Sequence, residues 1–377
     1  SPPANSTAAF VVANASVNIQ GISVVVNQNI PYGVFASSSY VTLSSVSVST
    51  SGGLGIYTAG VRISSRSAIS YSTVTVWNAH GIWLDGSSMT VVSYSTAVSK
   101  NAGFYALSLN GSDGNTVLRS YIANLEGHGA GLDSGADSNT ISQSTLVSNG
   151  SGYNALYLSD ADSNTVTGSY IANPAGSGVG LDGTADYNTI SLSTMIGGGA
   201  GNVALIFSDS DGNTVTDSYM QNLTGYAASL ELGADHNTIS RSTIASNAAA
   251  FSALYISASS SNTVMNSYVQ GSTAALISGS TGTVIRGSIF EATNSIGSAL
   301  AFTGGSVNLT IATSTLLAPS LGRGLALNEG NTGVVGLSSV IFSGAARGME
   351  ISTQGASFSL AVDSITFRGL ASGATAI

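Results

Sequence analysis

The dipeptide Asn-Thr recurs through the middle of the chain at an almost constant spacing. Consecutive copies are 24 or 25 residues apart, at Asn115, Asn139, Asn164, Asn188, Asn213, Asn237 and Asn262. A fixed period of this length is typical of solenoids, in which each repeat packs only against its neighbours. We therefore expect one coil for every 24–25 residues and a fold assembled by stacking coils.

A second regularity joins the coils in pairs. A Ser stands five residues after each Asn, and the residue after that Ser alternates between Tyr and Thr along the seven copies. The tyrosines are Tyr121, Tyr170, Tyr219 and Tyr268, each 49 residues from the next. The alternation indicates duplication of a two-coil unit.

Each coil contains three short segments with strand character. In residues 165–167 and 169–171 a single aliphatic residue is flanked by hydroxyl or aromatic residues, and residues 155–158 hold two leucines on one face. This period-two alternation predicts strands whose aliphatic side chains point inward. Gly, Asn, Asp and Ser between the segments supply the corners.

Weaker copies of the pattern extend in both directions from the most regular part, residues 81–290. We therefore predict an all-β parallel β-helix of about 15 coils, with three short strands per coil and one domain over residues 1–377. At a strand spacing of about 4.8 Å, such a solenoid would be roughly 70 Å long. We find no capping element at either end, and expect the ends to be uncapped.

Composition excludes several classes of partner. The net charge is −9 with a single lysine, Lys100, so no basic patch is available for nucleic acid or an anionic membrane surface. No apolar run approaches the ~18 residues that a membrane-inserted helix needs. Cysteine is absent, which excludes disulfides and thiolate metal sites. The start, residues 1–7, is interpreted as a mature end left by signal-peptide removal or as an arbitrary boundary, and we predict an extracellular or cell-surface location.

The Asn-Thr-Ile/Val signature at this spacing resembles the right-handed parallel β-helix repeats of the pectate-lyase-like superfamily. The resemblance implies a right-handed coil but specifies function poorly, because the superfamily contains polysaccharide lyases, hydrolases, epimerases, phage tailspikes and adhesins. The Asp-Pro-His-Asp signature of its epimerases and the paired-Asp and Gly-His-Gly motifs of its polygalacturonases are absent. The histidines His80, His128 and His236 are isolated in the sequence. We therefore predict no catalytic residues and a closer likeness to the surface and adhesin members than to the enzymes.

Acidic residues are aligned along one edge of the predicted solenoid. An Asp precedes six of the Asn-Thr copies by two positions: Asp113, Asp137, Asp162, Asp186, Asp211 and Asp235. Their mutual repulsion could be relieved in turns, where each carboxylate accepts backbone N–H groups. It could also be relieved by Ca²⁺, the one cofactor we consider, because alternate oxygen ligands occur in two loops, at Asp160 and Asp162 and at Asp209 and Asp211. Both interpretations are open.

Two further columns of side chains should face outward. The threonine of each Asn-Thr pair could form a hydroxyl array of the kind that ice-binding solenoids present, although a β-branched residue is ordinary on an exposed strand. The tyrosine column could contact a glycan or a partner, or could pack over the smaller threonine of the intervening coil. Its members are Tyr121, Tyr170, Tyr219 and Tyr268.

These features predict a secreted or cell-surface structural protein without catalysis: a rod or stalk, a self-associating fibre, or an adhesin module. Uncapped coil ends would favour end-to-end or lateral self-association, because an open strand edge is a template for pairing. The alternative is a polysaccharide-active enzyme (lyase, hydrolase or epimerase) or a glycan-binding β-helix.

Overall fold

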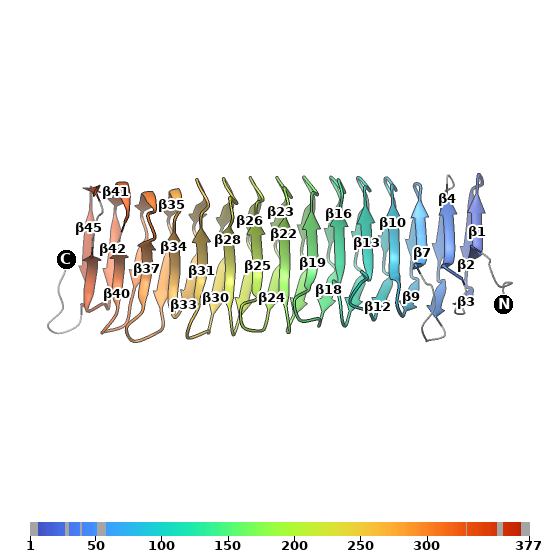
Figure 1. Ribbon diagram of the computed structural model, residues 1–377, viewed down its shortest axis with the longest axis horizontal. Helices are drawn as coiled ribbons and strands as arrows, with labels where there is room; N and C mark the ends of the chain where they lie inside the picture. The colour runs from blue at the N-terminus through green and yellow to red at the C-terminus, as the bar shows by residue number, and fades with distance from the viewer. Residues whose placement is uncertain are drawn as a thin grey trace. The chain divides into compact units, whose positions relative to one another are not determined.

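The computed structural model describes residues 7–26, 30–37, 40–50, 58–328, 330–352 and 357–370. It divides into two compact units, unit 1 (Ser1–Thr194) and unit 2 (Met195–Ile377), which we describe separately. All regular elements in the described residues are β-strands, stacked in parallel within each unit (Figure 1). The described residues contain no helix long and apolar enough to span a bilayer. The all-β prediction is confirmed, and the expectation of a single domain stays a prediction.

The strands of unit 1 form three parallel sheets, and each strand pairs with the strands three before and three after it. Sheet A contains β1 (Ala8–Ala13), β4 (Tyr32–Ser37), β7 (Ala59–Ser64), β10 (His80–Asp85), β13 (Leu107–Asn110), β16 (Ala130–Asp133), β19 (Asn154–Ser159) and β22 (Ser177–Asp182). Sheet B contains β2 (Val17–Gln20), β5 (Val41–Ser44), β8 (Ala68–Ser70), β11 (Val91–Ser93), β14 (Thr116–Leu118), β17 (Thr140–Ser142), β20 (Thr165–Thr167) and β23 (Thr189–Ser191). Sheet C contains β3 (Ser23–Val26), β6 (Ser47–Thr50), β9 (Thr73–Val76), β12 (Thr96–Ser99), β15 (Tyr121–Asn124), β18 (Thr145–Ser148) and β21 (Tyr170–Asn173).

Unit 2 follows the same plan, after β24 (Thr194–Gly197) at the boundary between the units. Its sheet A contains β25 (Val203–Ser208), β28 (Tyr226–Glu231), β31 (Ser252–Ser257), β34 (Thr273–Ser278), β37 (Ser298–Thr303), β40 (Arg323–Leu327) and β43 (Arg347–Ile351). Sheet B contains β26 (Thr214–Thr216), β29 (Thr238–Ser240), β32 (Thr263–Met265), β35 (Thr281–Arg286), β38 (Val307–Ala312), β41 (Thr332–Ser338) and β44 (Ser357–Val362). Sheet C contains β27 (Tyr219–Asn222), β30 (Thr243–Ser246), β33 (Tyr268–Gly271), β36 (Ile289–Ala292), β39 (Thr315–Leu317), β42 (Val340–Ser343) and β45 (Ile365–Arg368).

One coil visits sheets A, B and C in turn, as the sequence predicts. In β20 the central Val166 is buried between two half-exposed threonines, and in β21 Ile171 is buried while Tyr170 is exposed. Because the strands are in register, aliphatic side chains of successive coils lie on one another: Val166 pairs with Ile141 in the coil before and with Ile190 in the coil after. Each buried aliphatic side chain contributes about 1.5–3 kcal/mol. The core is therefore a set of aliphatic columns inside the coil.

Buried asparagines satisfy the backbone at the corner between sheets A and B. The N–H of Asn115 donates to Oδ1 of Asn139, and the N–H of Asn139 donates to Oδ1 of Asn164, both at 2.8 Å. The side-chain oxygen of each Asn thus accepts a hydrogen bond from a buried backbone N–H of the coil before it, which an apolar side chain cannot do. The recurring Asn is therefore a structural requirement of this corner.

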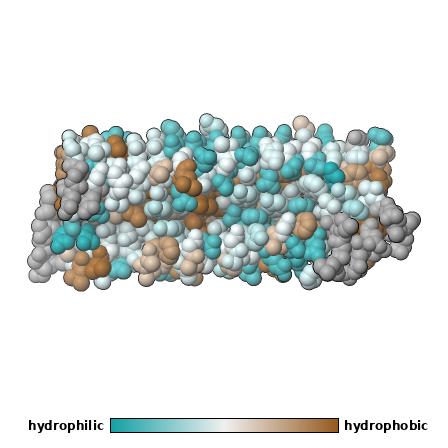
Figure 2. All heavy atoms as spheres, viewed as in Figure 1, coloured by the Kyte–Doolittle hydropathy of each residue, from teal (hydrophilic) through white to brown (hydrophobic). Residues whose placement is uncertain are grey.

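Small polar residues cover most of the outside. The face in Figure 2 is mainly pale to teal, with scattered brown groups. A line of larger, half-buried side chains lies on the outward face of sheet A in unit 1.

Candidate functional site

The outward face of sheet A in unit 1 carries the candidate site. In β10, Ile82 and Leu84 are buried, whereas His80, Trp83 and Asp85 are only half-buried and face outward. Strands on either side place their residues at the same outward positions, because the sheet is in register. Side chains far apart in sequence are thereby lined up along the sheet.

Four rings from successive coils stack on one another. The ring centroids of His80 and Tyr105 are 5.7 Å apart with planes 13° from parallel. Those of Tyr105 and His128 are 5.3 Å apart at 26°, and those of His128 and Tyr157 are 5.0 Å apart at 19°. Trp83 adjoins the first imidazole at 5.4 Å. We call His80, Trp83, Tyr105, His128 and Tyr157 the aromatic row.

Two loop aromatics support the imidazoles from the side. Phe104 meets His80 edge to face at 5.2 Å, and Tyr153 meets His128 in the same way at 5.0 Å. Buried asparagines from sheet C hold these loops, since Nδ2 of Asn124 donates to the carbonyl of Phe104 and Nδ2 of Asn173 to that of Tyr153, each at 2.6 Å. The row is therefore fixed by the same kind of buried amide that closes the corners.

Small residues beneath the row leave room for the rings. Trp83 pairs with Ser108, which pairs with Gly131, and Gly131 pairs with Tyr157. The ring of Tyr105 occupies the space outside Gly131, where a Cβ would lie 2.6 Å from a ring carbon. A glycine is needed at residue 131 because the tyrosine fills the volume that a side chain would take.

A cation ends the row on the side of the first coils. The Arg62 guanidinium lies 4.7 Å from the Trp83 ring centroid and 5.2 Å from that of Phe35, and it also covers Tyr32 at 5.5 Å. Arg62 forms an ion pair with Asp85. The charge of this arginine is therefore already compensated, and the guanidinium connects two groups of rings.

The two imidazoles are held as neutral rings of one tautomer. The backbone N–H of Tyr105 donates to Nδ1 of His80 at 3.1 Å, and that of Asn154 donates to Nδ1 of His128 at 3.0 Å. The ring hydrogen must therefore be on Nε2 in both residues. Burial lowers the pKa of His80 to about 4 and that of His128 to about 4. At neutral pH each ring thus offers an N–H donor without a charge.

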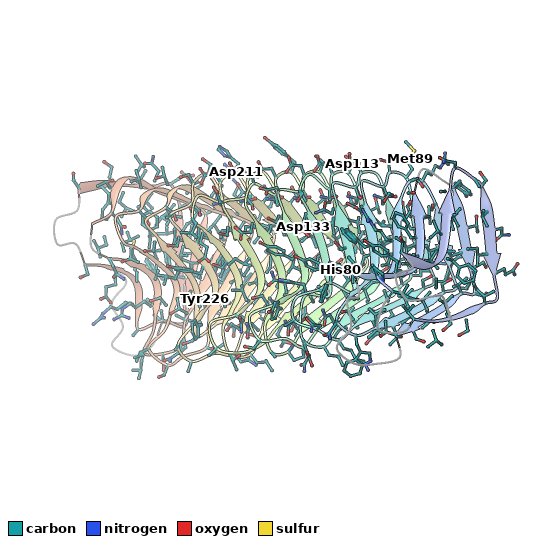
Figure 3. The ribbon with its side chains drawn as sticks, turned by 45° about the vertical axis from the view of Figure 1, so that its right-hand side comes forward. His80, Met89, Asp113, Asp133, Asp211 and Tyr226 are labelled. Carbon is teal, nitrogen blue, oxygen red and sulfur yellow. The ribbon has the colours of Figure 1, made fainter. Side chains whose placement is uncertain are left out.

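Two tyrosines of the row are paired with carboxylates. Tyr105 is hydrogen-bonded to Asp133, and the hydroxyl of Tyr157 donates to Oδ2 of Asp182 at 3.3 Å. Burial raises the pKa of Asp133 to about 6, and the negative charge of nearby Asp160 acts in the same direction, against the hydrogen bond from Tyr105. Burial likewise raises the pKa of Tyr105. Figure 3 shows His80 and Asp133 on the broad face of unit 1 and Asp113 at its edge.

Unit 2 repeats part of this arrangement. Tyr226 stacks on Tyr255 at 4.9 Å and 12°, and Phe251 meets Tyr226 edge to face at 4.9 Å. These residues follow His128, Tyr157 and Tyr153 by 98 residues, which is two 49-residue units. The aromatic pattern of sheet A is therefore part of the duplicated repeat.

The predicted acidic edge is present, and its carboxylates bind backbone groups. Within unit 1, Oδ1 of Asp113 accepts the N–H of Asp137 at 3.0 Å, and Oδ1 of Asp137 accepts the N–H of Asp162 at 2.7 Å. Oδ1 of Asp160 accepts the hydroxyl of Thr184 at 3.3 Å. In the described part of the chain, no three His, Cys, Asp or Glu side chains gather as a metal site requires. Asp162 and Asp211 each accept a backbone N–H of the next coil, at 2.8 and 2.7 Å. Calcium at Asp160, Asp162, Asp209 and Asp211 stays a prediction, as does the turn interpretation.

The predicted tyrosine column lies on the outward face of sheet C. Tyr121 and Tyr170 are 43% and 47% exposed, which leaves them accessible to a ligand. Tyr219 and Tyr268 are half-buried, and the Tyr268 hydroxyl is hydrogen-bonded to Glu291. Tyr121 and Tyr219 pair with a threonine of the next coil, whereas Tyr268 pairs with Ile289. The role of this column in glycan or partner contact stays a prediction.

Comparison with known proteins identifies the family. The sequence matches the right-handed beta helix region in three overlapping segments, residues 8–155, 59–219 and 137–316. The chain belongs to the right-handed β-helix family. The predicted right-handed, pectate-lyase-like parallel β-helix is thereby confirmed. No curated protein sequence matches the chain.

Solved structures of this β-helix fold cover most of the chain. A point mutant of the periplasmic alginate epimerase AlgG has a TM-score of 0.50 at 8% identity, covering 95% of this chain and 84% of its own. The A-module of a mannuronan C-5 epimerase from Azotobacter vinelandii gives 0.47 at 12% identity, covering 86% and 90%. The Dettilon tailspike protein gives 0.45 at 13% identity, covering 93% and 62%. At 8% identity, the similarity to the AlgG structure establishes the fold alone.

The β-helix corrects one interpretation of the sequence. His80 and His128 are isolated in sequence, but the structure joins them through Tyr105 into one stack. They are 48 residues apart, almost one two-coil unit, and this spacing is the signal that could have revealed them. His236 lies outside this stack, at a corner of unit 2 with a φ of 58°.

Proposed function

We propose that this β-helix protein binds a polysaccharide, and that the aromatic row on sheet A of unit 1 is its binding surface. The observation that carries the proposal is the line of side chains across six coils from Tyr32 to Tyr157, in which five coils supply rings and the Arg62 guanidinium bridges the rings on either side of it. Five steps of about 4.8 Å make the line roughly 24 Å long. A linear ligand, rather than a small compact one, fits such a surface.

The chemistry of the row suits a sugar chain. Sugars present both apolar C–H groups and hydroxyls, and rings with a polar edge offer both kinds of contact. The Nε2–H groups of His80 and His128 can donate to sugar oxygens, and the carboxylates of Asp133 and Asp182 can accept from sugar hydroxyls.

The comparisons are compatible with this proposal through the fold only. One of the similar structures is named as an alginate epimerase, one as a mannuronan C-5 epimerase and one as a tailspike protein, and alginate and mannuronan are polysaccharides. We propose an extracellular or cell-surface location, where such a ligand would be met.

Affinity electrophoresis in gels that contain dissolved polysaccharides tests the proposal. We expect retardation of the unmodified protein by at least one polymer, and loss of that retardation in Trp83→Ala and Tyr157→Ala. Both side chains face outward, so neither substitution opens the core. Tyr187→Ala is the matched control, because Tyr187 is 67% exposed and lies outside the row.

The same gels separate the two aromatic surfaces. Tyr170→Ala tests the tyrosine column of sheet C. If Tyr170→Ala abolished retardation while Trp83→Ala and Tyr157→Ala did not, the ligand would bind sheet C and the proposal for sheet A would be wrong.

A polysaccharide-active enzyme is the second candidate. It is favoured by the Tyr105–Asp133 pair beside His128, because a carboxyl with a pKa of about 6 can exchange protons near neutral pH. Release of new chain ends from a bound polymer, abolished in Asp133→Asn with binding retained, would support catalysis. Binding without any release would leave the protein a glycan-binding β-helix.

The stalk, fibre and adhesin roles stay predictions, as does self-association. Electron microscopy of the purified protein distinguishes filaments from separate particles. Glycan binding is compatible with an adhesin module, whereas a purely mechanical rod has no need of the aromatic row.

A further inference from the structure

We propose that the polysaccharide bound by the aromatic row is uncharged, and that polyuronates are excluded. This inference rests on the proposed function and names its ligand class. It concerns the charges that surround the row rather than the rings themselves.

Carboxylates border the row along its length. Asp133 and Asp182 are attached to the row through the hydroxyls of Tyr105 and Tyr157. Their strands are in register through Ser159, so both carboxylates lie on one side of the rings, two coils apart. Asp160 adds a third negative charge close to Asp133. A chain with a carboxylate on every sugar would meet like charges at each of these positions.

Of the four cations of unit 1, three are engaged by other groups, and the fourth, Arg66, is exposed at the corner between sheets A and B, after β7. Among the described residues of unit 1, Arg62 is the cation with a ring contact to the row, and it is paired with Asp85. Lys100 lies over the Trp77 ring at 4.6 Å. Arg119 lies at the corner between sheets B and C, where its Nε donates to Gln143 at 2.7 Å. Recognition of a uronate needs a free guanidinium or ammonium, and the row offers none among these residues.

The donors of the row match neutral sugar oxygens instead. Both imidazoles are uncharged at neutral pH, since burial lowers the pKa of each to about 4. Their Nε2–H groups donate without attracting an anion, and the carboxylates accept the hydroxyl hydrogens that a neutral sugar supplies. The row thus offers imidazole N–H donors and carboxylate acceptors, and its imidazoles carry no positive charge at neutral pH.

A panel of polymers tests the inference at pH 7 in EDTA. The neutral set contains a β-glucan, a xylan, a mannan and a galactan, and the anionic set contains polygalacturonate and alginate. We expect one or more neutral polymers to bind at least about tenfold more tightly than either polyuronate, a difference of about 1.4 kcal/mol. Trp83→Ala and Tyr157→Ala should remove this binding, and Tyr187→Ala should retain it. Binding of a neutral polymer should be equal at roughly 50 mM and roughly 500 mM salt, since screening acts on charges.

Each outcome decides between the two proposals. If a polyuronate binds as tightly as the neutral polymers, in EDTA or with added Ca²⁺, and loses binding in both row variants, the inference is wrong and the proposed function stands. If no polymer binds through the row, the proposed function fails and the inference fails with it. Selective, salt-independent binding of a neutral polymer supports both.

Discussion

Acidification should lower the stability of the folded protein, because two imidazoles of the aromatic row are buried. Burial lowers the pKa of His80 and that of His128 from 6.5 to about 4. In the unfolded chain the same side chains would take up a proton near the ordinary value of about 6.5. Between pH 6.5 and 4, the unfolded state therefore binds more protons than the folded state, and stability falls as the pH falls.

The size of the effect follows from the two shifts. Each pKa is lowered by about 2.5, and at 1.36 kcal/mol for each pH unit this is at most about 3 kcal/mol per imidazole. Asp133 acts in the opposite direction, because its pKa is raised from 3.8 to about 6. Its contribution is present below pH 3.8 and is lost as the pH rises through 6. Two imidazoles outweigh one carboxyl, so we expect a net loss of up to about 3 kcal/mol between pH 7 and pH 4.

NMR of the histidine rings measures the cause directly. The chain has three histidines, so His80→Asn and His128→Asn assign the two signals of interest. The asparagine oxygen can still accept the backbone N–H that Nδ1 accepts, so each variant keeps that contact and removes the titration. We expect both rings to be Nε2–H tautomers that stay neutral at pH 5. Denaturant unfolding at several pH values should then show a flatter profile in the double variant. Titration of either ring near pH 6.5, or an Nδ1–H tautomer, would refute the reasoning.

Three further predictions concern the glycine beneath the Tyr105 ring, the buried asparagines at the corner between sheets A and B, and calcium. Gly131→Ala should displace the Tyr105 ring, because the new Cβ would lie 2.6 Å from it, and lower stability by about 1–3 kcal/mol in thermal or denaturant unfolding. An unchanged Tm would contradict the packing. Asn237→Ala should cost about 1 kcal/mol more than Asn164→Ala, because both side-chain oxygens accept a backbone N–H but only the Nδ2 of Asn237 has a partner. Equal losses would show that the Nδ2 bond contributes nothing. Calcium binding would make Tm fall when EDTA is added, and an unchanged Tm would exclude Ca²⁺ from Asp160, Asp162, Asp209 and Asp211.

The repeat in the sequence determined the fold. Inward Val166 and Ile171, outward Tyr170 and the corner at Asn164 all follow from alternation within one coil and from the Asn-Thr period. These features depend on residues two positions apart and on a nearly constant coil length, both of which are visible in the chain. Strand placement, core columns and coil number could therefore be predicted without coordinates.

Only the tertiary structure decided the aromatic row. The steps from His80 to Tyr105, to His128 and to Tyr157 are 25, 23 and 29 residues, so the stack follows no constant period, and only the 48 residues between the two histidines come close to the two-coil unit. Loops of different length between sheets C and A set the first two steps, and buried asparagines fix the conformation of two such loops. The third step is longer because Tyr157 is in register with Gly131, three positions further along the strand than His128. The lowered pKa of the imidazoles and the raised pKa of Asp133 arise from burial that the stack creates. Alternation along a strand is a local property, whereas contact between coils depends on how every loop brings the next strand into register.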